Sequence, residues 1–378
     1  MTTIHTGGGA AIEGDLENRG TFVGRDLTIH VTWQAAPFTL DQPDLAGLRA
    51  DYLAYLHEAH QYLDFRGVPQ VERIAQQLPL DAVYVPLRAR PERPEGETWW
   101  RVAGREWDGA ELLEAGGVPA ARERALAAEP VTVDRALGEA PALVILGDPG
   151  AGKSTLLKVL ALALARQEEG PLPILLPLNA YAAALEQGEA VSLHDFLARY
   201  FRSRQGRLRD LAPLFEAALA AGQAVVLLDG LDEVQDRRGF LVRLVQDFCA
   251  EHIPEPGAPQ LPGASQTPGN RLVVTSRIVG YRDAPLDGMR WRTYTLVDFG
   301  PAEIERFVER WTLAFEVAAR GETETARQAA ARERAALLAA IRGRPSIERL
   351  ASNPLLLTIL ALIKRQGVTL PERRVELY

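Results

Sequence analysis

The segment GDPGAGKST, residues 147–155, constrains the fold of this chain more than any other feature. It satisfies the pattern G-x-x-x-x-G-K-[ST], and it lies between the apolar run ALVIL and the helical run TLLKVLALALA. Glycines let such a loop wrap closely around phosphate oxygens, so that successive backbone N–H groups point inward. The helix that follows directs its positive end at the same point. The motif therefore predicts a strand–loop–helix unit that binds a nucleoside triphosphate.

Each residue of this loop is a candidate for nucleotide contact. Lys153 is expected to neutralise charge on the β- and γ-phosphates, and the Ser154 hydroxyl is expected to ligate Mg²⁺. The alternative, a glycine-rich turn that matches by chance, is disfavoured by the flanking strand and helix patterns. The residues predicted to bind the nucleotide are Gly147, Asp148, Pro149, Gly150, Ala151, Gly152, Lys153, Ser154 and Thr155.

A second apolar run, AVVLLDGLDE at residues 224–233, ends in acids. Carboxylates at the carboxyl end of a parallel strand face the crevice where ligands bind. Asp229 is therefore predicted to hold the magnesium, directly or through water, because such sites use few protein ligands. Asp232 and Glu233 lie just beyond it, where they can orient and polarise an attacking water. The alternative is a helix N-terminus that merely carries acids.

A third apolar run, RLVVTSR at residues 271–277, ends in polar side chains. Thr275, Ser276 or Arg277 is a candidate for contact with the γ-phosphate, and an arginine there can stabilise its charge. The alternative is a surface arginine in a turn. Arg277 joins Asp232 and Glu233 as a predicted catalytic residue.

Apolar runs alternate with helical patterns over residues 129–300, which predicts an α/β core with a parallel sheet sandwiched by helices. Candidate strands are 142–146, 174–178, 224–228, 272–275 and 293–297. A helical domain is expected over 301–378. Upstream, residues 1–40 are expected to form a glycine-rich, β-prone leader, with a small β oligomerisation element and a flexible leader as equal alternatives, and 41–128 are expected to form a helical or mixed region. Within that region 81–87 predicts a strand, and the Pro- and charge-rich stretch 88–97 predicts a break.

Composition excludes several other classes. The chain has 42 basic and 50 acidic residues and a net charge of −8, so non-specific attraction to nucleic acid is not expected. The single cysteine, Cys249, excludes an intrachain disulfide and is expected to be a core thiol. The N-terminus lacks the pattern of a signal peptide, and the apolar runs fall short of a membrane span. We therefore expect a cytoplasmic protein without a membrane partner.

The ordered trio GDPGAGKST, VVLLDGLDE and VVTSR resembles the NACHT group of signal-transduction NTPases, which belongs to the STAND class of P-loop proteins. The tandem acids of DGLDE are the most specific part of the likeness. Farther on, LASNPLLLTILALIK at 350–364 is similar to the helical segment behind the NACHT core, and the resemblance implies that Pro354 packs near the adenine. LPERRVELY at 370–378 is similar to the start of a winged-helix region, so we expect the chain to be cut there.

The resemblance implies a bacterial, NLR-like immune sensor that acts notably against phage. In that family ADP locks a closed monomer, and ATP favours an open form that forms a homo-oligomer. The trigger ligand and the effector are unknown from the sequence. We therefore predict a slow, regulatory ATPase that binds ATP or ADP with Mg²⁺. The alternatives are an AAA+-like motor, a P-loop kinase, and a binding module with an inactive site; the last is disfavoured because Lys153, Ser154, Asp229 and Glu233 are all present.

Overall fold

The computed structural model divides the chain into two compact units, Met1–Asp44 and Leu45–Tyr378. In the first unit, strand β1 (Thr3–Ile4) pairs antiparallel with β2 (Ile12–Glu13). The rest of the predicted leader lies outside the described residues, as do residues 92–129 and the last residues of the chain. The structure describes residues 3–4, 12–13, 44–63, 74–91, 130–167, 169–188, 191–204, 208, 210–233, 238–255, 269–281, 284–368 and 370.

Within the described residues of the second unit, seven strands form one mixed sheet in the order β4-β3-β9-β5-β8-β7-β6. The five strands from β9 to β6 are parallel, whereas β3 pairs antiparallel with both β9 and β4. The α/β class with a mainly parallel sheet is confirmed. The strands are β3 (Arg88–Pro91), β4 (Val131–Thr132), β5 (Ala142–Leu146), β6 (Leu172–Pro177), β7 (Ala224–Asp229), β8 (Arg271–Ser276) and β9 (Trp291–Leu296).

The five predicted parallel strands are all present, with ends that differ from the predicted ends by at most two residues. The central parts of β5, β6, β7 and β8 are apolar without alternation because both faces of the sheet are covered, whereas β9 carries Arg292, Thr293 and Thr295. Strand β5 is buried at every position. The order places β8 between β5 and β7. As a result, the polar end of β8 lies between the phosphate-binding loop after β5 and the acids after β7.

Helices flank this sheet. Helix α7 packs against β6, β7 and β8, and α1 packs against α7. Cys249 on α11 is buried, as predicted for a core thiol, and burial raises its pKa to about 11. The helices are α1 (Leu45–His60), η1 (Ala75–Gln77), α2 (Leu80–Val83), α6 (Val133–Glu139), α7 (Lys153–Ala165), α8 (Leu178–Glu186), α9 (Leu193–Arg204), α10 (Ala212–Ala220), η2 (Leu231–Glu233), α11 (Arg238–His252) and α12 (Ile278–Tyr281), where η marks a 3₁₀ turn.

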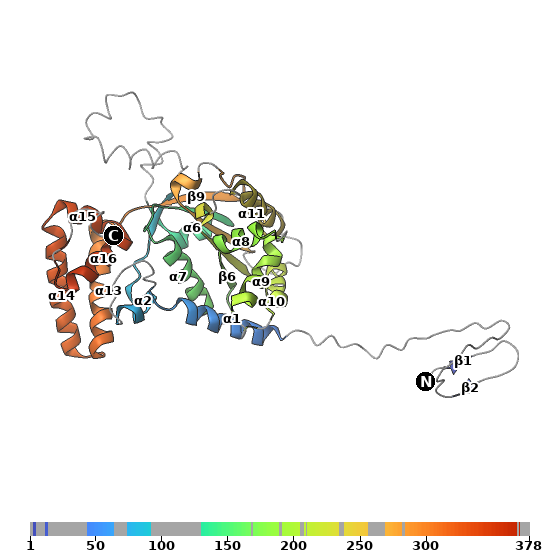
Figure 1. The fold of residues 1–378 in the computed structure, drawn as a ribbon, viewed down its shortest axis with the longest axis horizontal. Helices are drawn as coiled ribbons and strands as arrows, with labels where there is room; N and C mark the ends of the chain where they lie inside the picture. The colour runs from blue at the N-terminus through green and yellow to red at the C-terminus, as the bar shows by residue number, and fades with distance from the viewer. Residues whose placement is uncertain are drawn as a thin grey trace, which may run out of the picture. The chain divides into compact units, whose positions relative to one another are not determined.

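A helical region follows β9, as predicted. It contains α13 (Pro301–Arg320), α14 (Glu324–Arg342), α15 (Pro345–Ala351) and α16 (Pro354–Arg365), drawn in orange and red in Figure 1. Helices α13 and α14 pack along each other, and Arg334 forms ion pairs with Glu305 and Glu309. None of the helices among the described residues is both long enough and apolar enough to span a bilayer.

The segment before the core differs from its prediction. Residues 81–87 do not form a strand: Leu80–Val83 is the helix α2, and the strand β3 begins at Arg88, inside the predicted break. Backbone pairing explains the shift, because Ala89 lies opposite Leu296 and the Val297 N–H donates to the Arg88 carbonyl at 2.9 Å. Pro86 lacks an N–H, which disfavours a paired strand in the preceding residues.

Candidate functional site

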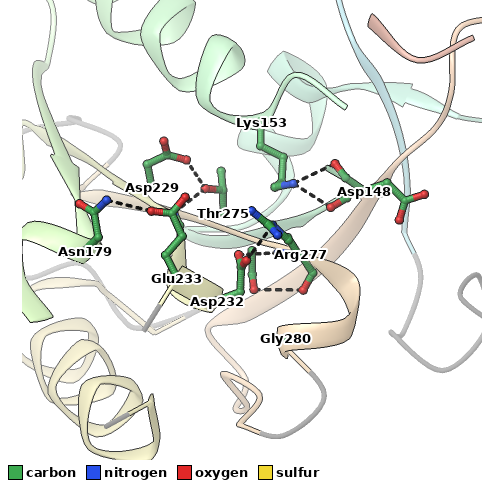
Figure 2. A network of polar contacts seen from close by, with 12 residues as sticks. Asp148, Lys153, Asn179, Asp229, Asp232, Glu233, Thr275, Arg277 and Gly280 are labelled. Carbon is green, nitrogen blue, oxygen red and sulfur yellow. Dashed lines mark hydrogen bonds and ion pairs between the residues drawn. The ribbon is translucent and has the colours of Figure 1, made fainter. Parts of the chain in front are cut away.

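The phosphate-binding loop runs from the end of β5 to the start of α7, as predicted. Gly150 and Gly152 have φ values of +81° and +90°, which other residues rarely adopt. The Lys153 ammonium donates hydrogen bonds to the carbonyls of Gly147 at 2.7 Å and Asp148 at 3.1 Å. Figure 2 shows these bonds, with the Asp148 carboxylate turned away from them. The loop therefore curls around its own lysine.

Burial lowers the pKa of Lys153 from its ordinary value. The nearby carboxylate of Asp232 opposes this shift, and the guanidinium of Arg277 adds to it. A buried ammonium among carbonyl oxygens is a strong site for an anion, because few water molecules screen the attraction. The geometry thus suits phosphate.

Asp229 ends strand β7 beside the polar end of β8. The Thr275 hydroxyl donates to the Asp229 carboxylate at 2.5 Å and accepts from the Gly230 N–H at 3.0 Å. Thr275 is buried, so it fixes the orientation of the carboxylate. The remaining carboxylate oxygen and the Ser154 hydroxyl belong to residues that line one cavity. In the described part of the chain, no group of three His, Cys, Asp or Glu side chains forms a metal site. This small set of oxygen donors fits Mg²⁺, which keeps waters and binds phosphate oxygens.

Asp232 and Arg277 form a close pair across η2 and β8. The Arg277 backbone N–H donates to one Asp232 oxygen at 2.7 Å, and its side chain contacts the other oxygen at 3.1 Å (Figure 2). Arg238 holds the Asp232 carbonyl at 3.1 Å. Gly280 packs so tightly here that a Cβ on it would lie 2.4 Å from the Cβ of Asp232. Asp232 is therefore held from several sides, while half of the Arg277 side chain stays exposed.

Glu233 lies at the end of η2, where the Asn179 side-chain amide donates to its carboxylate at 2.9 Å (Figure 2). Burial raises the pKa of Glu233, and the charges of Asp229 and Asp232 raise it further. Arg277 and the Asn179 hydrogen bond lower it. A carboxylate with a raised pKa is a better proton acceptor, which suits a general base.

These groups line a cavity of about 420 Å³, a volume typical of small-molecule sites. Its wall combines the polar groups of the loop and the acids with apolar side chains, among them Val83, Leu87, Phe307 and Pro354. Gly147, Asp148 and Ala151 belong to the same loop but do not line the cavity. The predicted residues that line it are Pro149, Gly150, Gly152, Lys153, Ser154, Thr155, Asp229, Asp232, Glu233, Arg277 and Pro354.

Helix α16 contacts the phosphate-binding loop directly. The Asn353 side chain donates to the Pro149 carbonyl at 3.1 Å, and the Leu355 N–H donates to the Gly150 carbonyl at 3.2 Å. Neither residue was predicted for the site. An asparagine directly before Pro354 signals a helix start, but it does not indicate which surface the helix meets. Asn179 was missed for the same reason.

Replacing Gly150 with alanine is expected to destabilise the protein more than replacing Gly188. Both glycines have positive φ, +81° and +86°, so each substitution costs about 1–2 kcal/mol in backbone strain. At Gly150 the new Cβ would also lie 2.7 Å from the Asn353 side-chain oxygen, whereas at Gly188 no atom lies within 4 Å. Chemical denaturation of both variants measures the difference. Equal losses would show that α16 does not pack on the loop as described.

A glycine loop between a strand and a helix, with acids from the next-but-one strand across the same cavity, defines a P-loop NTPase domain. Residues 142–314 match the family model of the NACHT domain, which is consistent with a NACHT-domain P-loop NTPase. No curated protein matches the chain. The cavity extends beyond the matched residues, because Val83 and Leu87 line it from one side and Pro354 from the other.

Proposed function

We propose that this chain is a regulatory ATPase that binds ATP or ADP with Mg²⁺, and that the bound nucleotide controls self-association and signalling. One observation carries the proposal. A single cavity is lined by the phosphate-binding loop, by the acids that follow β7, and by helix α16 of the helical region. A ligand in this cavity contacts both the sheet core and the helical region. If the ligand binds one arrangement of these two regions more tightly than another, it shifts the equilibrium toward that arrangement.

The polar groups of the cavity wall are assigned to the phosphates. Lys153 neutralises the β- and γ-phosphates, and Arg277 reaches the γ-phosphate from the exposed side. Ser154 and Asp229 hold Mg²⁺, which supplies further charge neutralisation when bound. The apolar side chains of the wall, with Pro354, receive the adenine.

The acids beyond Asp229 are assigned to hydrolysis. Glu233 accepts a proton from the attacking water, and Asp232 helps to orient that water. Both acids already have partners, because Asp232 pairs with Arg277 and Glu233 accepts from Asn179.

The nucleotide that accompanies the purified protein tests this assignment. We expect ADP to co-purify, because a switch with slow turnover retains its product, and mass spectrometry of the released ligand identifies it. The steady-state rate of ATP hydrolysis should also be well below 1 s⁻¹, under the range of about 1–10³ s⁻¹ common for enzymes. Fast turnover with a site that purifies free of nucleotide would instead indicate an AAA+-like motor or a kinase.

The wider role in our proposal is that of a cytoplasmic, NLR-like STAND protein in bacterial antiphage defence. The family resemblance supports this role, and the site geometry supports the nucleotide chemistry. ATP is expected to favour a homo-oligomer and ADP a monomer. The trigger and the effector that such a switch connects are matters for experiment.

A further inference from the structure

Asn353 forms hydrogen bonds to two parts of the molecule at once. Its side-chain oxygen accepts from the Leu356 N–H at 3.2 Å, which caps the N-terminus of α16. Its side-chain nitrogen donates to the Pro149 carbonyl at 3.1 Å, across 204 residues of sequence. One amide therefore joins the first turn of the last helix to the phosphate-binding loop.

A second bond runs parallel to the first. The Leu355 N–H, one of the free N–H groups in the first turn of α16, donates to the Gly150 carbonyl at 3.2 Å. Gly150 permits this approach, since a Cβ there would lie 2.7 Å from the Asn353 oxygen and 3.0 Å from the Leu355 Cβ. Two consecutive carbonyls of the loop are thus bound by the N-terminus of α16.

The direction of these carbonyls determines where the N–H groups of the same peptide planes point. A peptide plane that points its carbonyl outward points its N–H inward, and an anion nest consists of such inward N–H groups. Fixing the Pro149 carbonyl therefore orients the N–H of Gly150, which shares its peptide plane, whereas the Ala151 N–H donates to the Asp148 carbonyl at 3.1 Å. Preorganised donors need no rearrangement when phosphate binds.

We propose that Asn353 is a positioning residue for the phosphate-binding loop, which slows nucleotide release and makes release depend on the contact between α16 and the loop. The inference rests on the nucleotide binding proposed above. It differs from the assignment of Pro354, because Asn353 acts through the backbone of the loop and not through the adenine.

Two substitutions separate the loop bond from the helix cap. Asn353→Ser keeps a good N-cap but is too short to reach the Pro149 carbonyl, whereas Asn353→Ala removes both functions. Thr323→Ala is the matched control, since Thr323 caps α14 through the Ala326 N–H at 3.2 Å and does not line the cavity. The readouts are the dissociation rate of a fluorescent ADP analogue, followed by stopped flow, and the melting temperature of the nucleotide-free protein.

We expect Asn353→Ser to release the analogue about fivefold to tenfold faster than wild type, as for the loss of one neutral hydrogen bond. Asn353→Ala should release it at least as fast and also melt lower. Thr323→Ala should melt lower but release at the wild-type rate, which shows what a lost cap alone does. If Asn353→Ser releases at the wild-type rate while wild type binds the analogue, this inference is wrong and the proposed function stands. If wild type does not bind the analogue, the proposed function falls, and this inference with it.

Discussion

Replacing Lys153 with alanine is expected to weaken ATP and ADP binding about a hundredfold. The ammonium belongs to a residue that lines the cavity, where burial leaves it poorly screened. Hydrogen bonds to charged groups contribute up to about 3 kcal/mol, and about 2.7 kcal/mol corresponds to a hundredfold change in affinity. Isothermal titration calorimetry with Mg²⁺ present measures the loss directly.

The matched control is Lys158→Ala. Lys158 lies on the same helix, α7, but it does not line the cavity. Its loss removes one positive charge at a similar place in the sequence, so it corrects for the change in net charge. We expect the Lys158 variant to bind nucleotide as wild type does. Wild-type affinity in the Lys153 variant would rule out the phosphate site described here.

Replacing Glu233 with glutamine is expected to reduce ATP hydrolysis by about 10²-fold or more while nucleotide binding is retained. Glutamine keeps the size of the side chain and can still accept the Asn179 hydrogen bond, but it cannot take a proton from water. Loss of a general base typically costs about 10²–10⁴ in rate. Single-turnover hydrolysis measures the chemical step, and Glu186→Gln, at the exposed end of α8, is the control.

The pH dependence of hydrolysis provides a second test of Glu233. Its pKa is raised, chiefly by burial and then by Asp229 and Asp232. The base is active only when ionised, so the rate should fall as pH decreases through this raised value, at higher pH than for an ordinary glutamate. A pH–rate profile that is flat across this region would remove Glu233 from the role of base.

Local patterns were sufficient to predict the loop, the acids and Arg277. Each of these residues lies at the end of an apolar strand, and the carboxyl ends of parallel strands meet at one edge of the sheet. The positions of Lys153, Asp229 and Glu233 in the sequence were therefore enough to place them at this edge of the sheet. The same logic predicted all five parallel strands.

Local patterns were insufficient for the apolar part of the cavity wall. The alternation in residues 81–87 predicts a strand, yet the buried residues Val83, Val85 and Leu87 turn toward the cavity and its loop instead of joining the sheet. The paired strand is Arg88–Pro91, whose arginines made it resemble a surface break. Its position beside β9 depends on residues about 200 positions later in the sequence.

The two asparagines were missed because their partners are distant in sequence. Asn179 meets Glu233, 54 residues away, and Asn353 meets Pro149, 204 residues away. Asparagine is common in turns and at helix starts, so its type alone carries no functional signal. Only the packing of α8 against η2 and of α16 against the phosphate-binding loop reveals these contacts.

Sedimentation velocity of the Glu233→Gln variant tests the proposed switch most directly, because this variant is expected to hold ATP without hydrolysing it. One sample contains ADP with Mg²⁺, and the other contains ATP with Mg²⁺. We expect a monomer with ADP and a larger assembly with ATP. The same sedimentation coefficient in both samples, with nucleotide bound in each, would contradict control of self-association by the nucleotide.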